Sequence, residues 1–147
     1  MDTASSVQGI KSLFRHPDLG LLIIRAALGF ILLYSGYNKF MGGEETIHAV
    51  GLNINYLGLD VTPGTISTLF FGVLAAGIEV VCGLGLIVGY LFRTSTVALF
   101  LVMVVATLMK LDTSHGDPKE FGYPLVMALV LLGLLFTGSG RVSLQKD

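Results

Sequence analysis

The sequence predicts an all-α integral membrane protein, a bundle of four transmembrane helices. Hydrophobic residues make up 53% of the 147 residues and charged residues only 13%, whereas a soluble domain usually has about 25% charged residues. Membrane-spanning helices need about 17–25 apolar residues. Four apolar segments meet this requirement, at about 19–40, 65–92, 95–111 and 121–137. We expect residues 1–147 to form one membrane domain.

The first segment, residues 19–40, carries two cations on one face. Arg25 and Lys39 are fourteen residues apart, which leaves them about 40° apart around an ideal helix. Gly29 and Gly36 fall on the same face. Because a small and charged face avoids lipid, we expect this face to point toward other helices.

The longest connection, residues 42–63, contains a stretch compatible with a short surface helix at 44–50. In that helix Ile47, Ala49 and Val50 would lie against the membrane surface. The asparagines and the proline that follow indicate irregular structure before the next segment.

The second segment, residues 65–92, carries a single acid, Glu79. Small residues share its helix face at spacings of three and four, and a second small pair follows toward the end of the segment. Small residues allow the backbones of membrane helices to approach closely. We therefore predict a packing role for Gly29, Gly36, Gly72, Ala76, Gly83, Gly85 and Gly89.

Four crossings place both termini on the same side of the membrane. Five Lys and Arg residues lie on that side and three on the other, which also carries six acids. The positive-inside rule therefore predicts that both termini are cytoplasmic, in a cell (inner or plasma) membrane. The net charge of −1 and the scattered basic residues give no reason to expect a nucleic-acid partner.

Arg25 and Glu79 are the ionisable residues deepest in the predicted membrane. Each costs about 2.5–3.5 kcal/mol at a helix centre, and pairing would lower this cost. Their expected depths differ by about 10 Å, which is long for a direct bond, so Lys39 is the alternative partner of Glu79. We favour Arg25, because Lys39 can extend to the surface without a partner. Three interpretations stay open: a structural ion pair, a polar site that faces a quinone head group, an ion or a proton path, and a residue that points at a partner subunit. A quinone pocket would also use Lys39, Tyr34 and Tyr37.

Several other chemistries are excluded or not expected. The single cysteine, Cys82, cannot form a disulfide framework, a CxxC pair or a thiolate cluster within one chain. No histidine falls in the middle of a predicted span, so we expect no haem. Glu45 and His48 have the Glu-x-x-His spacing of di-iron sites, but those sites use two such motifs in a bundle core. We interpret Glu45, His48 and His115 as part of a solvated outer surface and expect neither a metal nor a covalent cofactor.

The charged and glycine-containing motifs of the first two segments and of the C-terminal tail, taken in their order along the chain, resemble those of the DoxX family of small four-helix membrane proteins. The end of that family's first helix, Gly-x-x-Lys, is matched by residues 36–39. The glutamate in that family's second helix is matched by Glu79. The arginine-containing turn that follows that helix is matched by residues 92–94. The terminal glycine-x-glycine-arginine followed by serine is matched by residues 138–143, with Ser139 where proline is common.

The resemblance implies a four-helix fold and a role in a membrane complex. The family is named after a small subunit of an archaeal complex that oxidises thiosulfate and passes electrons to quinone. Other members are linked to membrane oxidoreductase complexes or have no known role. A shared fold does not by itself assign a reaction.

We therefore expect a non-catalytic subunit that anchors or completes a membrane-bound respiratory or electron-transfer oxidoreductase complex and contacts quinone. Its partners would be lipids and other membrane subunits. One alternative is a stand-alone quinone-binding oxidoreductase component. The other is a small proton-coupled transporter that uses Glu79, although a nearby Arg25 would hold Glu79 ionised and oppose this role. The sequence has no recognisable flavin, nucleotide or haem motif, so a partner would bring the redox cofactor.

Overall fold

The computed structural model describes residues 17–140 and residue 143, and this part of the chain contains helices and no strand. Residues 141–142 of the terminal motif lie outside it. The elements, in order, are α2 (Pro17–Met41), α3 (Gly43–Leu52), the 3-10 helix η1 (Asn53–Leu57), α4 (Ile66–Val88), α5 (Phe92–Thr113) and α6 (Pro118–Thr137). Because α2, α4, α5 and α6 are long and apolar enough to cross a membrane, the predicted all-α fold with four spans is confirmed. The cytoplasmic location of the termini stays a prediction.

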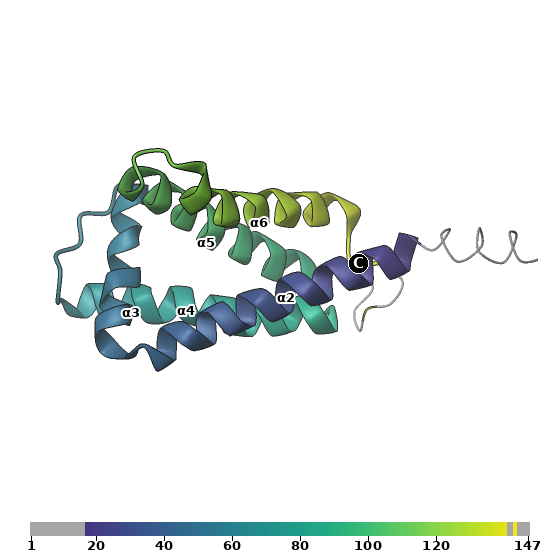
Figure 1. The fold of residues 1–147 in the computed structure, drawn as a ribbon. Helices are drawn as coiled ribbons and strands as arrows, with labels where there is room; N and C mark the ends of the chain where they lie inside the picture. The colour runs from purple at the N-terminus through teal and green to yellow at the C-terminus, as the bar shows by residue number, and fades with distance from the viewer. Residues whose placement is uncertain (1–16, 141–142, 144–147) are drawn as a thin grey trace, which may run out of the picture.

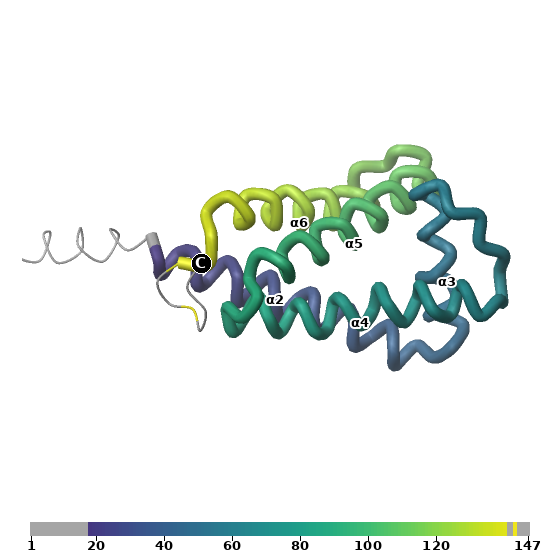
Figure 2. The backbone as a smooth tube through the Cα atoms, turned by 180° about the vertical axis from the view of Figure 1, so that it is seen from behind, coloured from purple at the N-terminus to yellow at the C-terminus, as the bar shows by residue number. Residues whose placement is uncertain are grey.

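The four spans form two antiparallel pairs, and α3 lies across one end of them. Figure 1 shows α2 running along α4, and α5 running along α6. The start of α2 and the C-terminal segment lie together at the other end (Figure 1). Both views show α3 and η1 crossing from the α2–α4 pair toward α5 (Figure 2). We call these two ends of the bundle the α3 end and the terminal end.

Small residues bring α2 and α4 into direct backbone contact. A Cβ atom added to Gly29 would lie 2.6 Å from the carbonyl oxygen of Gly83. One added to Gly36 would lie 2.8 Å from the carbonyl oxygen of Ala76. Such close approach is typical of membrane helices, which gain stability from packing rather than from exclusion of water.

Gly72 faces α3 instead of α2. A Cβ atom on Gly72 would overlap the carbonyl oxygen of Ile47, and one on Gly51 would overlap the carbonyl oxygen of Thr68. At this crossing, His48 Nδ1 lies 2.6 Å from Thr68 Oγ1. The expectation that Ile47 lies on the membrane surface was wrong, because these two glycines let α3 pack on α4 and bury Ile47.

The turn between α4 and α5 corrects two predicted boundaries. The second helix was expected to reach Phe92, but α4 ends at Val88 because Gly89 adopts a left-handed conformation with φ 74°. Its N–H donates to the carbonyl oxygen of Gly85 and closes the helix. The third helix was expected from Ser95, but α5 already begins at Phe92.

The fourth helix begins earlier than the expected Phe121. The Asp117 side chain accepts a hydrogen bond from the N–H of Lys119, and Pro118 occupies the first turn, where its missing N–H costs nothing. These two residues start α6 at Pro118. The resulting 20-residue helix is long enough to span a membrane with less strain than the shorter segment read from the sequence.

The apolar core fills the half of the bundle next to the terminal end. All four spans contribute to it, through Leu28, Leu32, Leu86, Phe92, Leu99, Met103, Met127, Ala128, Leu131 and Leu134. The other half, below α3, is packed less completely and contains a cavity. The fold therefore combines a closed half with a hollow half.

Candidate functional site

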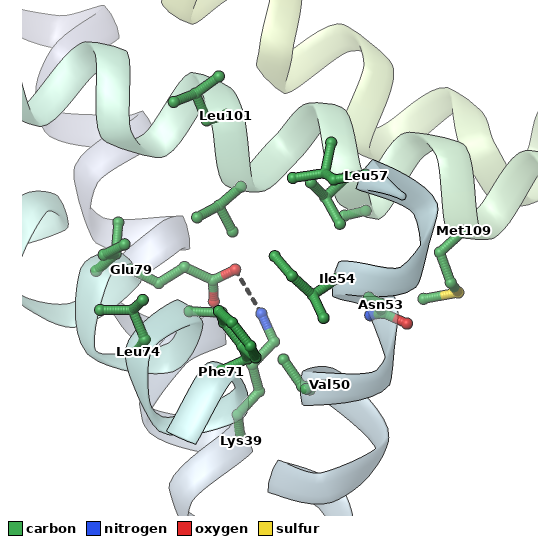
Figure 3. Close-up of a pocket in the computed structure, with 16 residues that line it drawn as sticks. Lys39, Val50, Asn53, Ile54, Leu57, Phe71, Leu74, Glu79, Leu101 and Met109 are labelled. Atoms are coloured by element: carbon green, nitrogen blue, oxygen red, sulfur yellow. Dashed lines mark hydrogen bonds and ion pairs between the residues drawn. The ribbon is translucent and has the colours of Figure 1, made fainter. Parts of the chain in front are cut away.

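A buried ion pair joins α2 to α4 at the edge of the hollow half. The Nζ atom of Lys39 donates to Oε1 of Glu79 (Figure 3). The Glu79 side chain is completely buried, whereas the Lys39 side chain is 24% exposed. Gly36 makes the pairing possible, because its missing side chain leaves room for the Glu79 Cβ. The carboxylate can then run along α2 to Lys39, which lies about one turn further on.

Arg25 is not the partner of Glu79, so the favoured pairing was wrong. The guanidinium lies toward the terminal end, where its Nη1 donates to the carbonyl oxygen of Ser139 over 2.6 Å. The depth difference expected between Arg25 and Glu79 already opposed a direct bond. The error was the assumption that Lys39 would extend to the surface.

Arg25 instead fastens the C-terminal segment to the bundle. It is only 3% exposed, and a Cβ atom on Gly89 would lie 2.9 Å from its Nη1 and 2.7 Å from the Ser143 Cβ. Glycine at 89 therefore leaves the space in which the guanidinium meets this segment. A hydrogen bond from a charged group contributes about 1.5–3 kcal/mol, so the contacts of Arg25 point to a structural role.

A cavity of about 240 Å³ lies beside the ion pair, between α4 and α5 and below α3 and η1 (Figure 3). Of the 16 residues that line it, only Lys39, Asn53 and Glu79 have polar side chains. The others are Val50, Gly51, Ile54, Leu57, Phe71, Leu74, Ala75, Ile78, Leu101, Val102, Val105, Ala106 and Met109. The cavity is thus apolar except at the wall formed by the ion pair and at Asn53.

We place a mouth of the cavity between α4 and α5, on the surface that lipid would cover, from the exposure of two lining residues. Leu74 of α4 is 45% exposed and Leu101 of α5 is 57% exposed, although both line the cavity. Apolar side chains at such exposure on membrane-spanning helices are expected to contact lipid. A molecule dissolved in the bilayer can therefore reach the cavity between α4 and α5 without passing through water.

The roof of the cavity is built by α3 and η1. Figure 3 shows Val50 and Ile54 pointing from these elements into the cavity. The far end of the roof is tied to α5, because Tyr56 Oη donates to Asp112 Oδ2 over 2.9 Å. This hydrogen bond raises the pKa of Tyr56 above its ordinary value, with desolvation and the negative charge of Asp112 acting in the same direction.

One oxygen of the buried carboxylate lacks a hydrogen-bond donor. Within the described residues, Glu79 Oε2 is buried and accepts no hydrogen bond, while Oε1 is bound to Lys39. Buried polar atoms almost always have partners, and an unsatisfied one costs about 1–3 kcal/mol, or more when charged. The polar wall of the cavity therefore has an unused acceptor.

A second hollow lies on the other side of Lys39, between α2, α3 and α6. This groove of about 400 Å³ is lined by Ile31, Tyr34, Ser35, Asn38, Lys39, Thr46 and Tyr123. All but Ile31 carry polar side chains, in contrast to the cavity. Lys39 is the residue that the two linings share, and Ser35 Oγ lies 3.5 Å from its Nζ.

The two tyrosines predicted for the pocket do not line the cavity. Tyr34 lies in the groove, on the opposite side of Lys39. Tyr37 is 51% exposed and lines neither hollow. The remaining predicted packing residue, Gly85, lies next to the start of α5, where an added Cβ would be 2.7 Å from Ser95 Oγ.

The polar residues of the outer surface do not converge. Glu45 and His115 are both exposed, while His48 turns toward Thr68 and lies 3.6 Å from Glu44. No three His, Cys, Asp or Glu side chains gather in a metal-binding group anywhere in residues 17–140. Cys82 is partly buried and packs against the apolar core.

Sequence reasoning missed the roof and most of the groove. Val50, Ile54 and Leu57 follow one another at spacings of four and three, which is the period of an apolar helix face. That signal was present, but Asn53 and Asn55 were read as breaking regular structure. Tyr123 had no such signal, because nothing in the sequence of α6 shows that it faces α2.

The fold and the site together define a class: a four-helix membrane protein with a lipid-facing apolar cavity beside a buried ion pair. The chain belongs to the DoxX family, whose model matches residues 20–111. The match includes both partners of the ion pair, the roof and nearly all of α5, and it ends before α6. No curated protein and no solved structure gives a significant match to the chain.

Proposed function

We propose that the chain is a small membrane subunit of an oxidoreductase complex and that its cavity binds the head group of a quinone or quinol. One observation carries the binding proposal: an ion pair with an unsatisfied carboxylate oxygen forms the polar wall of an apolar cavity that opens toward lipid. A ligand suited to this cavity is apolar over most of its surface and polar at one end. Quinones with an isoprenoid tail have this character.

The size of the cavity supports a ring rather than a whole lipid. Sites for small molecules usually measure about 300–1,000 Å³, and this cavity measures about 240 Å³. A single ring fits, and its tail would leave through the mouth between Leu74 and Leu101. The isoprenoid chain would then lie in the bilayer.

The ion pair offers hydrogen bonds to both redox states of such a ring. The ammonium of Lys39 has N–H groups to donate to a quinone carbonyl, and Glu79 Oε2 can accept from a quinol hydroxyl. Because the Glu79 side chain is fully covered, the neighbouring side chains would shift slightly as the ring enters. The quinone supplies the redox chemistry, and this chain binds the ring, orients it and excludes water from it.

The first test measures binding to the purified protein in lipid nanodiscs. A short-tailed benzoquinol should raise the unfolding temperature of the wild-type protein, by the equivalent of about 2.7 kcal/mol at a ligand concentration 100 times Kd. Glu79→Gln should fold but show a smaller shift, because an amide gives a neutral acceptor in place of the carboxylate. Leu101→Trp should abolish the shift by filling the mouth.

Leu129→Trp is the matched control for Leu101→Trp. Leu129 of α6 is exposed to the same degree, 58% against 57%, and lines neither hollow. This variant should bind as the wild type does. Equal shifts in Leu101→Trp and wild type would show that quinol binds elsewhere or not at all in this cavity.

The subunit role is tested by gentle-detergent purification from native membranes. We expect the chain to co-migrate with an oxidoreductase that carries its own cofactor, identified by mass spectrometry, with quinone among the extracted lipids. Recovery of the chain without a protein partner but with stoichiometric quinone would support quinone binding and contradict the subunit role. Recovery with neither would contradict both parts of the proposal.

A further inference from the structure

We infer that the groove between α2 and α6 is the aqueous proton route of the Lys39–Glu79 pair, so that the pair exchanges protons with the α3 end of the bundle while a ligand fills the cavity. This inference deepens the proposed function and rests on it for the identity of the ligand. Three features of the described residues carry it: the shared position of Lys39, the location of the groove and the closed core on the other side.

Lys39 lines two hollows that differ in the number of polar side chains around them. On one side it lines the apolar cavity together with Glu79, and on the other it lines the polar groove. Its side chain keeps 24% exposure although it is paired with a carboxylate that has none. Part of the Lys39 side chain is therefore accessible from outside the pair while its ammonium remains bonded to Glu79.

One end of the groove reaches the α3 end of the bundle. Thr46 belongs to α3, which lies across the end of the bundle, and Asn38 is in the last turn of α2. Tyr34 and Tyr123 are the titratable side chains that share the groove with Lys39, and tyrosines are enriched at the interface between lipid and water. These hydroxyl and amide groups can hold water close to the ammonium.

Among the described residues, the bundle is closed toward the terminal end. There the space between the spans is filled by buried apolar side chains that include Leu28, Leu32 and Leu131. The mouth of the cavity opens between leucines, toward lipid, and a bound ligand would fill it. Protons of the pair are thus directed to the α3 end.

The proton balance is as follows. A ligand hydroxyl in the cavity gives a proton to the Glu79 carboxylate, and the Lys39 ammonium releases one to water in the groove. The Glu79 carboxyl then passes its proton to the Lys39 amine, which restores the ammonium and the carboxylate. One cycle moves one proton from the cavity to the groove. Two cycles move both hydroxyl protons of a quinol, and its two electrons go to the redox partner in the complex.

The test uses cysteine accessibility in sealed proteoliposomes, with a charged methanethiosulfonate that cannot cross lipid. Cys82→Ala gives a cysteine-free background, into which Ser35→Cys places a thiol in the groove. Asp60→Cys marks the α3 side and Thr94→Cys the terminal side, because both positions are exposed outside or at the edge of the spans. Leu129→Cys is the lipid-facing control.

We expect Ser35→Cys to react from the same side as Asp60→Cys. Because only a thiolate in water is reactive, its rate should be within about tenfold of that marker, and Leu129→Cys should be at least about 100-fold slower. Failure of Ser35→Cys to react from that side would overturn the inference even if quinol binds. Reaction at Ser35→Cys without quinol binding to the wild type would leave the hydrated groove standing and reject the quinone proposal.

A second measurement tests proton movement itself. In the co-purified complex, Ser35→Leu should fill the groove and lower the turnover of quinol at least about tenfold, with an unchanged quinol-induced thermal shift because the cavity is untouched. Ser67→Leu is the control, since Ser67 is exposed in the first turn of α4 and lines neither hollow. Unchanged turnover in Ser35→Leu would overturn the inference.

Discussion

Lys39→Met is expected to lower the free energy of unfolding by about 3–5 kcal/mol, the usual cost of breaking a buried ion pair by removing one partner. The substitution keeps an unbranched side chain of nearly the same length but leaves Glu79, which has no exposed surface, without its cation. The remaining carboxylate would be buried with both oxygens unsatisfied, since Oε2 already lacks a donor among the described residues. Denaturant titration in detergent micelles measures the loss.

Two controls separate pairing from the loss of a charge. Lys110→Met removes a lysine whose partner Glu120, 3.0 Å away, is 56% exposed, so its cost should be only about 0–1 kcal/mol. The double variant Lys39→Met with Glu79→Leu should recover most of the lost stability, because apolar replacements of a buried pair are often neutral or stabilising. It should still fail to bind quinol. Equal losses in Lys39→Met and Lys110→Met would show that the pair is solvated.

The four-span fold was predictable because it depends on composition summed over long segments. The α2–α4 interface was predictable for a similar reason: Gly29, Gly36, Ala76 and Gly83 repeat at helical spacing, and repetition on one face survives errors in the helix ends. A boundary set by a single residue was not predictable in the same way. Gly89 ends α4 four residues early through one left-handed conformation.

The partner of Glu79 depended on a choice that the sequence does not resolve. Arg25 and Lys39 lie on the same face of α2, so periodicity cannot distinguish them. The distinction comes from how far α2 and α4 slide past each other, and that register is set by the contact between Gly36 and Ala76. The expected difference in depth correctly opposed a bond between Arg25 and Glu79. The prediction was wrong because it gave more weight to the ability of Lys39 to extend to the surface without a partner.

The cavity was the part least accessible to sequence reasoning. Its apolar walls come from α4, α5 and a connection with two asparagines, and its existence depends on where α3 crosses α4. The groove is similar, because Tyr123 meets Lys39 only through the packing of α6 opposite α2. Hollows are set by the distances between elements, whereas sequence patterns report mainly on faces within one element.

Gly72→Ala is expected to destabilise the protein by about 1–3 kcal/mol, the range for overpacking a tight contact, and to abolish quinol binding. The added methyl group would overlap the carbonyl oxygen of Ile47. A backbone atom cannot rotate away, so α3 must move as a unit. Because α3 carries Val50 and leads into Ile54, that movement would lift the roof off the cavity.

Gly77→Ala is the matched control, one and a half turns further along α4. A Cβ atom there meets no heavy atom within 4 Å, and alanine is favoured over glycine in a helix by about 0.8–1.0 kcal/mol. This variant should be as stable as the wild type or more stable, and it should bind quinol normally. A methyl group added at these two positions of α4 is thus expected to have opposite effects on stability. Thermal unfolding with and without quinol measures both effects. Wild-type behaviour of Gly72→Ala would show that α3 does not pack on α4 at this distance and that the roof of the cavity is assembled differently.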